Sequence, residues 1–377
     1  MKQLFSKNHD WFLIGTIFLL TIFGLVMVFS SSYVWAFYQV GDYYFFIQRQ
    51  LIWFGIATVM FIIFMNFSYP FYRKMSMPLV LLSILLLVLV VLFGVTVNHA
   101  QRWLDIGPFR IQPSEFVKIF MIIYLAQVYS SKQAYINKFI KGVLPPLIVV
   151  CVILGLIMKQ PDLGTATSIL LVTGLIVFFS GAKVVHLILL SSVGIGMFAL
   201  FATSADYRMA RLISYRDPFE YAAKEGYQLI QSYVAIAHGG LSGVGLGQSV
   251  QKLMYLPEPH TDFIFSIISE ELGIIGVLFV LTCYSIILVK GVIIGAKCKN
   301  PFGSLLAYGI TFQVAIQVVF NIGAVTGLLP ITGIPLPLIS NGGSSLLVTM
   351  VSLAILANIA KSNRKQQRNK EDLLQTA

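Results

Sequence analysis

Charged residues are scarce in this chain, and their scarcity excludes an ordinary soluble domain. Only 11% of the 377 residues are charged, whereas 57% are hydrophobic. A soluble domain carries about 25% charged residues. No linker-like stretch sets off a soluble part. The composition therefore predicts a polytopic membrane protein, built as one integral membrane domain over residues 1–377.

Cysteines are also few, and they exclude two common kinds of stabilising site. Cys151, Cys283 and Cys298 lie in or beside apolar runs and lack the spacing of metal ligands. They predict neither a disulfide framework nor a zinc site. The first apolar run, from Trp11 to Ser31, has no small-residue cleavage site like that of a signal peptide. We therefore expect it to be a retained membrane helix.

Ten apolar runs predict an all-α fold with ten transmembrane helices. Several runs are short for a bilayer that needs about 20 residues per helix. Pro145, Pro146 and Pro161 interrupt the middle ones, so we expect broken or tilted helices there. The predicted spans are 11–31, 48–67, 77–97, 114–129, 143–158, 164–181, 185–203, 263–289, 303–325 and 345–360.

The placement of lysine and arginine predicts the orientation of these spans. With the N-terminus in the cytoplasm, the inner segments hold sixteen of the 26 basic residues and only three of the 15 acidic ones. We therefore expect both termini in the cytoplasm. The net charge of +11 then reflects topology, and we expect no nucleic-acid partner. The basic tail, about 361–377, is predicted to be disordered and suited to anionic lipid.

The longest predicted loop covers about 204–262, on the outer side between spans seven and eight. Loops this long within a compact fold are usually functional. Its glycine-rich stretch, 238–247, follows no predicted strand, so tight turns explain it better than a dinucleotide site. Residues Tyr227 to Ala237 have an amphipathic pattern that predicts a helix along the membrane interface.

The end of this loop carries the most unusual group of residues. Glu258, His260, Thr261 and Asp262 lie within five residues and run directly into an apolar segment. Charged groups at the mouth of a membrane helix are costly to place there, which favours a functional cluster that binds substrate. The alternative is a solvated loop in which Thr261 or Asp262 caps the helix.

A second polar stretch precedes span four and contains Arg102, Arg110, Glu115 and Lys118. Glu115 and Lys118 are three residues apart, so they share one helix face. An unpaired lysine at this depth would cost about 3 kcal/mol. The two residues form either an internal ion pair or, together with Arg110, a cationic pocket for an anionic group.

Two further segments are candidates for the same region. Lys159 and Asp162 join spans five and six, where Asp162 either caps the next helix or forms an outer charge pair. Between 327 and 345, three prolines in eight residues forbid a continuous helix, so this backbone must line a cavity or lie buried in protein. Small residues that follow offer an anion site at a helix start, or close helix packing. They are Ser340, Gly342, Gly343, Ser344 and Ser345.

These features converge on the outer leaflet of the membrane. An anionic headgroup, such as a lipid-linked phosphate, would suit the cations there electrostatically. Asp262 would then serve as a general base or as a metal ligand. The pattern alone leaves open whether the protein processes that lipid or moves it. The cations are Arg102, Arg110, Lys118, Lys159 and Lys252.

Four stretches together resemble the SEDS family (shape, elongation, division and sporulation). They occur in the family's order, and the combination is highly specific. The family usually has tyrosine where this chain has Asn341. Residues 243–247, Lys252 and 255–258 look closer to the family's FtsW and SpoVE members than to RodA. The four stretches are 110–118, 159–165, 255–265 with 270–273, and 335–345.

The resemblance implies a peptidoglycan glycosyltransferase that acts at the outer face of the bacterial cytoplasmic membrane. It would polymerise lipid II and release undecaprenyl pyrophosphate during division, sporulation or growth. Asp262 matches the family's essential aspartate, and Arg110 and Lys118 match basic positions that the family needs. Glu115, Lys159 and Asp162 match further characteristic polar positions. A divalent cation, Mg²⁺ or Mn²⁺, is a candidate ligand of Asp262, and no organic cofactor is expected.

The resemblance also implies protein partners. They are a single-pass class B penicillin-binding transpeptidase and other divisome or elongasome membrane proteins. Two alternatives stay open, a lipid II flippase and a membrane scaffold for a wall synthase. A flippase needs a polar path to the inner leaflet, whereas the strong polar motifs here cluster outside and the first three spans are almost uniformly apolar.

Overall fold

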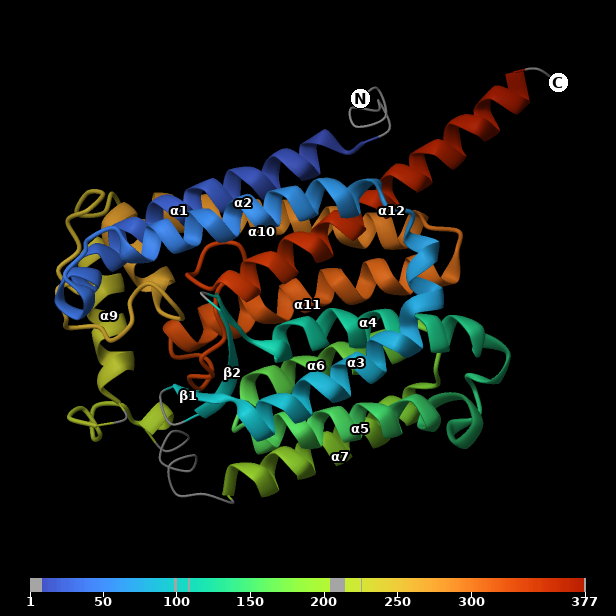
Figure 1. Cartoon of the computed structure of the whole chain (residues 1–377), viewed down its shortest axis with the longest axis horizontal. Helices are drawn as coiled ribbons and strands as arrows, with labels where there is room; N and C mark the ends of the chain where they lie inside the picture. The colour runs from blue at the N-terminus through green and yellow to red at the C-terminus, as the bar shows by residue number, and fades with distance from the viewer. Residues whose placement is uncertain (1–8, 98–99, 108, 204–213, 225, 376–377) are drawn as a thin grey trace.

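The fold is a bundle of long helices with one small sheet (Figure 1). The computed structural model describes residues 9–375 except 98–99, 108, 204–213 and 225. The helices are α1 (Trp11–Val40), α2 (Phe45–Asn66), α3 (Tyr72–Phe93), α4 (Pro113–Ser131), α5 (Leu144–Lys159), α6 (Leu163–Phe179), α7 (Val184–Thr203), α9 (Tyr227–Gly239), α10 (Ile264–Lys297), α11 (Pro301–Val325) and α12 (Gly343–Gln375).

Each of the ten predicted apolar segments overlaps one of these helices, which confirms the helical membrane class. Within the described residues, seven helical stretches are long and apolar enough to cross a membrane, and α6 is a shorter apolar helix. The number of ten crossings stays a prediction. α9 confirms the amphipathic helix predicted over 227–237, although the first part of its loop, 204–213, lies outside the described residues.

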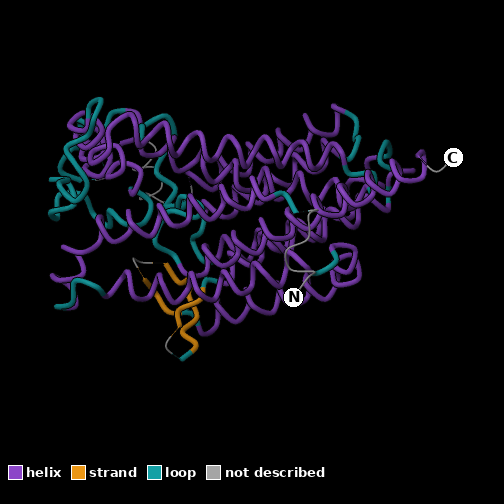
Figure 2. Tube along the Cα trace, turned by 90° about the horizontal axis from the view of Figure 1, so that it is seen from above, coloured by secondary structure: helices purple, strands orange, loops and turns teal. Residues whose placement is uncertain are grey.

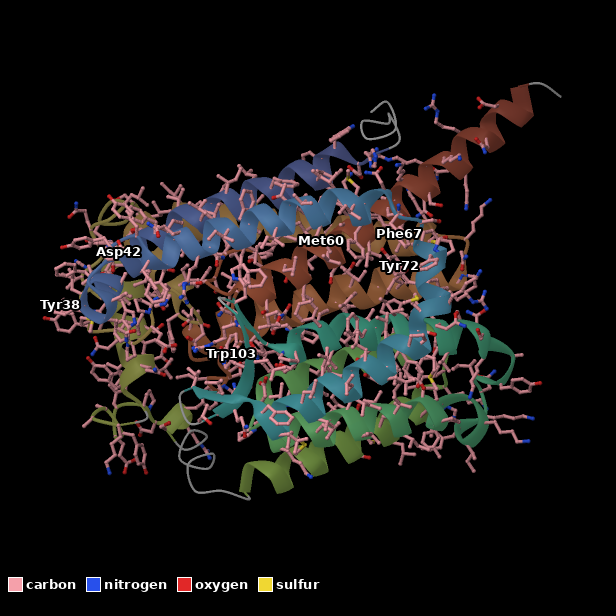
Figure 3. The ribbon with its side chains drawn as sticks, viewed as in Figure 1. Tyr38, Asp42, Met60, Phe67, Tyr72 and Trp103 are labelled. Carbon is pink, nitrogen blue, oxygen red and sulfur yellow. The ribbon has the colours of Figure 1, made fainter. Side chains whose placement is uncertain are left out.

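The long helices run side by side, so the loops gather at two opposite ends of the molecule (Figures 1 and 2). Both termini lie toward one end, and α9 lies at the other, here called the α9 end. Figure 3 places Tyr38 and Asp42 at the α9 end, and Phe67 and Tyr72 toward the end with the termini. In the core, α12 packs mainly on α2, and α11 packs on α4, α6 and α10.

A three-stranded antiparallel sheet precedes α4, and the sequence did not predict it. Strands β1 (Val95–Val97), β2 (Ala100–Ile106) and β3 (Phe109–Ile111) pair in that order and are drawn orange in Figure 2. The all-α prediction was therefore incomplete. β-Branched and aromatic residues favour short strands here, and Gly107, with φ of +60°, turns the chain between β2 and β3.

Prolines begin helices in the middle of the chain, whereas the sequence suggested that they break them. Pro145 and Pro146 lie in the first turn of α5, after a π-helical turn over Phe139–Val143. Pro161 lies in the turn before α6. A proline in the first turn lacks only an N–H that has no helical partner. α5 and α6 are consequently short but intact.

The stretch between α11 and α12 is irregular, as its prolines predict, and it is buried in protein. The side chains of Leu336, Leu338 and Ile339 are almost fully covered. Gly24 of α1 makes this possible, because a Cβ there would meet the backbone of Leu338 and Ile339. Irregular backbone at this depth is tolerated where protein covers it.

The basic tail is helical, so the prediction of disorder was wrong. α12 continues through this segment to Gln375. Lysine, arginine and glutamine favour helix, and no glycine or proline interrupts them. Asn363 and Arg364 fix the start of the tail by donating to the carbonyls of Ile294 (3.0 Å) and His9 (2.7 Å).

Candidate active site

Asp262 lies two residues before α10, in a segment that neighbouring elements hold in place. Its carboxylate lies 2.9 Å from the Thr261 hydroxyl. Asn321 of α11 donates to the Asp262 carbonyl (2.7 Å) and to the Ile334 carbonyl (2.9 Å). The N-cap residue of α10 is Phe263, with no side-chain cap. The capping alternative is therefore wrong for Thr261 and Asp262.

The loop before Asp262 is tied to the irregular stretch before α12. The Ser340 hydroxyl donates to the Thr261 carbonyl (2.6 Å). The backbone amide of Asn341 donates to the His260 carbonyl (2.9 Å). Because this second contact uses the backbone, it does not require the tyrosine that is usual at position 341. Candidate residues about 80 positions apart in sequence are thus brought together.

Backbone strain concentrates in these two touching segments. Met254 and Glu258 in the first, and Leu338 in the second, have positive φ angles of 71°, 45° and 68°. Each costs on the order of 1–3 kcal/mol and persists only where the surroundings enforce it. The Glu258 carbonyl accepts from the Thr261 amide (3.1 Å), so this strained turn helps to orient the residue next to Asp262.

A small pocket surrounds Asp262, and a larger cavity lies beside it. Ile331 lines both the small pocket and the cavity, which has a volume of about 310 Å³. Buried polar atoms at the small pocket, Oγ1 of Thr332 and Oδ1 of Asn321, have no hydrogen-bond partner within the described chain. The residues that line the cavity are Ser214, Tyr215, Lys224, Tyr227, Gln228, Leu229, Pro257 and Ile331.

His260 is buried beside Phe46 of α2, with 4.4 Å between the ring centroids. Burial lowers the pKa of His260 from 6.5 to about 4. Its Nδ1 atom has no hydrogen-bond partner in the described residues. The imidazole is therefore neutral near pH 7 and packs the loop against α2, so it does not add a positive charge for an anionic substrate.

Glu115 and Lys118 form the ion pair that their spacing allowed. The distance from Lys118 Nζ to Glu115 Oε1 is 2.7 Å, and both side chains are buried. They line a small space together with Gln313 and Gln317 of α11 and Thr349 of α12. Lys118 therefore points into the bundle, and its charge is balanced locally.

Arg110 lies elsewhere, on the exposed strand β3. Its side chain is 47% exposed and pairs with Asp105 across the sheet at 2.8 Å. This hydrogen bond lowers the pKa of the Asp105 carboxyl. The described contacts thus place Arg110 and Lys118 in different environments, so they do not form the single cationic pocket considered from the sequence.

Asp162 joins three elements of the fold. Its Oδ1 atom caps α6 by accepting from the Thr165 amide (3.2 Å), which confirms the capped turn. Its Oδ2 atom accepts from Gln112 (3.3 Å) and Ser114 (3.4 Å). Its ion-pair partner is Arg102, at 3.7 Å.

The Lys159 side chain is exposed at the end of α5. Since the cation beside Asp162 is Arg102, the outer pair suggested for Lys159 and Asp162 does not form among the described contacts. Arg102 also donates to the carbonyls of Gln160 and Pro161, which fixes the turn between α5 and α6.

The glycines and serines at the start of α12 are used for packing. The Gly342 amide donates to Gln50 of α2 (3.3 Å), and a Cβ at Gly343 would meet the indole of Trp53. Ser344 Oγ accepts from the Gln112 amide (3.1 Å), whereas Ser345 is partly exposed. Close helix packing is therefore the better description of this motif, because its first amide is already occupied.

Lys252, expected among the outer cations, is buried. It is 1% exposed, and its ammonium lies 2.6 Å from Glu271 of α10. A fully covered lysine in an ion pair does not meet a substrate. Within the part of the chain that the structure describes, no group of three His, Cys, Asp or Glu residues is arranged to hold a metal.

Sequence reasoning missed several residues of this site. Asn321, Gln317 and Gln313 lie four residues apart on one buried face of α11, and that spacing within an apolar span was a readable signal. Lys224 and Tyr227 of the larger cavity gave no such signal, because only the tertiary fold brings them near Pro257.

The chain is similar to several known proteins over nearly its whole length. A family model of FtsW, RodA and SpoVE, described as cell cycle protein, matches residues 10–365. The probable peptidoglycan glycosyltransferase FtsW of Bacillus subtilis is 44% identical, covering 98% of this chain and 95% of that protein. Stage V sporulation protein E of the same organism is also 44% identical, over 93% and 96% of the two chains.

Solved structures share the fold as well. A chain from a structure reported as the structural coordination of polymerization and crosslinking by a peptidoglycan synthase complex matches with a TM-score of 0.81 and 26% identity. The match covers 95% of this chain and 99% of that one. The rod shape determining protein RodA of Thermus thermophilus matches with a TM-score of 0.71 and 26% identity, over 94% and 97%.

Proposed function

The chain belongs to the FtsW, RodA and SpoVE family and is a peptidoglycan glycosyltransferase, and from that premise we propose that it polymerises lipid II with Asp262 as the catalytic carboxylate. The observation that carries the proposal is the fixation of Asp262. Thr261 orients its side chain, Asn321 holds its backbone, and strained turns surround it. Such preorganisation is what a catalytic group requires.

The proposed reaction is a direct displacement at a sugar carbon. Lipid II is the acceptor, and the chain that carries the reacting MurNAc is the donor. Asp262 accepts the proton of the GlcNAc 4-hydroxyl of lipid II as that oxygen forms a bond to C1 of the donor MurNAc. The C1–O bond to the undecaprenyl pyrophosphate breaks, and the pyrophosphate leaves with the bond's electrons. Displacement from the opposite face inverts the configuration at C1.

Negative charge that develops on the pyrophosphate needs stabilising groups nearby. The exposed guanidinium of Arg110 is suited to this, because it can exchange Asp105 for a phosphate in bidentate contact. Lys159, exposed at the end of α5, is a second cation that we propose for this role. Lys118 is buried and neutralised by Glu115, so we assign the charge-stabilising role to the exposed cations.

Asp262 and the Thr261 hydroxyl fit a Mg²⁺ or Mn²⁺ ion only if substrate phosphates complete its shell, because no cluster of acidic ligands adjoins them in the described residues. When bound, such an ion would neutralise charge on the pyrophosphate. We propose the cavity lined by Lys224 and Tyr227 as the space for the saccharide or peptide part of a substrate.

We further propose ten membrane crossings, with both termini in the cytoplasm and the α9 end outside. A related chain is part of a peptidoglycan synthase complex that coordinates polymerization and crosslinking. A class B penicillin-binding transpeptidase is accordingly the proposed partner, within the division or sporulation machinery. The flippase and scaffold alternatives have no observation in the described chain that favours them over this reaction.

The test is glycan synthesis from purified lipid II by solubilised protein together with its transpeptidase. Wild type is compared with Asp262→Asn, with and without a chelator. We expect polymer from wild type only, with a loss of at least about a hundredfold in the variant. Near-normal polymerisation by Asp262→Asn would refute the proposed role, and loss of wild-type activity with chelator would establish the metal.

A further inference from the structure

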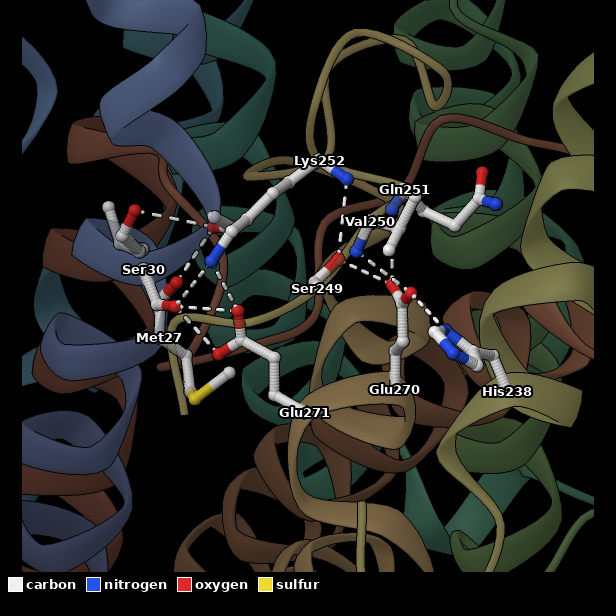
Figure 4. A network of polar contacts seen from close by, with 11 residues as sticks. Met27, Ser30, His238, Ser249, Val250, Gln251, Lys252, Glu270 and Glu271 are labelled. Carbon is white, nitrogen blue, oxygen red and sulfur yellow. Dashed lines mark hydrogen bonds and ion pairs between the residues drawn. The ribbon is translucent and has the colours of Figure 1, made fainter. Parts of the chain in front are cut away.

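Two adjacent buried glutamates lie beside the loop that leads to Asp262 (Figure 4). Glu270 and Glu271 of α10 are both 0% exposed. They come just before Gly273, where φ of +61° interrupts the helical path. Fully buried carboxylates are rare unless they are paired and hydrogen-bonded. The reaction proposed above uses neither of them.

Glu270 holds the chain at residues 249–251. Its carboxylate accepts hydrogen bonds from the backbone amides of Val250 (3.0 Å) and Gln251 (3.3 Å) and from the Ser249 hydroxyl. His238, at the end of α9, places Nδ1 2.9 Å from the same carboxylate. Hydrogen bonds to a charged acceptor are the strong ones, so this carboxylate fixes the backbone position of the loop.

Glu271 holds the next residue and adds α1 to the assembly. Its carboxylate lies 2.6 Å from Lys252 Nζ and accepts from the Ser30 hydroxyl at 2.6 and 2.8 Å. Lys252 Nζ also lies 3.3 Å from Ser30 Oγ and 4.9 Å from the centre of the Tyr33 ring. Because Lys252 is almost fully covered, α1, the loop and α10 are joined at one desolvated point.

Backbone contacts bring the glycine-rich stretch onto the same part of α10. The amides of Val244 and Gly245 donate to the carbonyls of Glu270 and Glu271, each at 3.0 Å. At Gly243, with φ of +76°, a Cβ would meet the Glu271 carbonyl. The glycine is therefore required both for the turn and for the close approach.

We infer that Glu270 and Glu271 are positioning residues that set the place of the catalytic carboxylate through the segment from Lys252 to Asp262. The inference rests on the proposed role of Asp262. The segment transmits position because it is a run of turns anchored by the fully buried Leu256, whose amide donates to the Gln251 carbonyl (2.9 Å). A displacement of about 1 Å at a reacting group can cost roughly 100-fold in rate.

The informative comparison is between Glu271→Gln and the double variant Glu271→Gln with Lys252→Met. The single variant leaves the buried ammonium of Lys252 without its counter-ion. The double variant removes both charges, and with them the tether, which is the contact that holds Lys252 to Glu271. We expect the double variant to keep a Tm near that of wild type. Its kcat should fall about tenfold or more with KM within about twofold, and amide hydrogen exchange over 249–262 should accelerate.

Asp10→Asn is the matched control, because it removes another carboxylate from ion pairs, with Lys290 and Arg364, beside the N-terminus. It should change neither kcat nor exchange over 249–262. A double variant whose kcat and Tm both return to the wild-type values would overturn the inference. That result is expected if the pair of Glu271 and Lys252 serves only the stability of the fold. Unchanged exchange over 249–262 would overturn it equally.

Glu270→Gln provides a second variant that stays informative if the double variant does not fold. It keeps the side-chain size but offers a single acceptor oxygen to the amides of Val250 and Gln251, so we expect the same fall in kcat and the same faster exchange. Asp262→Asn separates the two proposals. Normal polymerisation by that variant would refute the role of Asp262, while the exchange measurement would still report on the tether.

Discussion

His260 shows at the scale of one residue how burial decides chemistry. From the sequence it counted among candidate substrate-binding residues, beside Thr261 and Asp262. In the structure its ring packs on Phe46, and its carbonyl accepts from Asn341. A neutral, buried imidazole contributes to the fold of the loop through packing, and its protonation is opposed by the loss of water.

A pH dependence of stability follows from His260. Between pH 6.5 and about 4, the unfolded chain binds a proton at this ring that the folded chain does not. Stability is therefore lost as pH falls through this range, by up to about 3 kcal/mol from this residue. Thermal unfolding in detergent from pH 7 to 4 should show a fall in Tm that is smaller in His260→Asn.

The comparison between those two proteins isolates His260, because His9 titrates in the same range. The pKa of His9 is also lowered to about 4, by burial and then by Lys361 and Arg364. This second contribution is present in both proteins. Parallel curves for wild type and His260→Asn would show that His260 is protonated without penalty in the folded state.

At the scale of elements, α9 forms one wall of the large cavity near Asp262. Tyr227 and Gln228 lie in its first turn, and Lys224 precedes it. Pro257, which also lines the cavity, belongs to the same loop as Asp262. α9 therefore connects its loop to the segment that carries Asp262, and under the proposed function its side chains would contact the part of a substrate that does not react.

Removing cavity side chains should weaken substrate binding and leave the chemical step intact. For Lys224→Ala and Tyr227→Ala we expect a loss of about 1 to 2 kcal/mol of binding, a roughly 5- to 30-fold rise in KM for lipid II. The kcat should stay near the wild-type value, because these groups do not touch the reacting atoms. Steady-state polymerisation at varied lipid II concentration measures both.

Val234→Ala is the control on the same helix, since Val234 is exposed and does not line the cavity. Its KM should match wild type. Equal KM values for all three variants and wild type would show that the cavity does not contact the substrate.

At the scale of the whole molecule, the positions of the chain ends agree with an even number of crossings. Both termini lie toward one end, and Tyr38 lies at the other (Figures 1 and 3). Ten crossings place nine helices between Tyr38 and the basic tail, so the two must lie on opposite sides of the membrane. The excess of basic residues near the termini supports our proposal that this end faces the cytoplasm.

Cysteine labelling tests this topology in intact cells. In a variant without Cys151, Cys283 and Cys298, we expect Tyr38→Cys to react with a membrane-impermeant maleimide. Gln367→Cys should react only after permeabilisation, because both positions are exposed but face different compartments. Labelling of both residues from outside would contradict ten crossings.

Local sequence patterns predicted a large part of this fold and some of its site. Each predicted apolar run overlaps one of the described helices, because burial in lipid requires such runs. The three-residue spacing of Glu115 and Lys118 made their pair one of two alternatives, and a helix cap was one of the two roles considered for Asp162; the structure shows both. In both of these local contacts, Glu115 with Lys118 and Asp162 with Thr165, the two residues are three positions apart in the sequence.

Long-range contacts were not accessible in the same way. Lys252 and Arg110 looked alike as outer cations, yet the first is buried against Glu271 and the second is paired with Asp105 on an unpredicted sheet. The residues next to a lysine in the sequence do not show whether it will stay exposed or be buried against a carboxylate 19 residues away, as Lys252 is. The helical tail was missed for a different reason, because the prediction gave its basic charge more weight than the helix propensity of its lysine, arginine and glutamine residues.

The length of α1 has a consequence for how deeply the protein sits in its bilayer. Its 30 residues extend about 45 Å, roughly 15 Å more than the hydrocarbon layer. Its last turns and the following bend carry Phe37, Tyr38 and Tyr43, rings that prefer the interface. With the α9 end outside, as proposed, these rings hold the protein at the outer interface. A thicker or thinner bilayer is then accommodated at the opposite end, and the height of a lipid-linked pyrophosphate relative to Asp262 stays nearly constant.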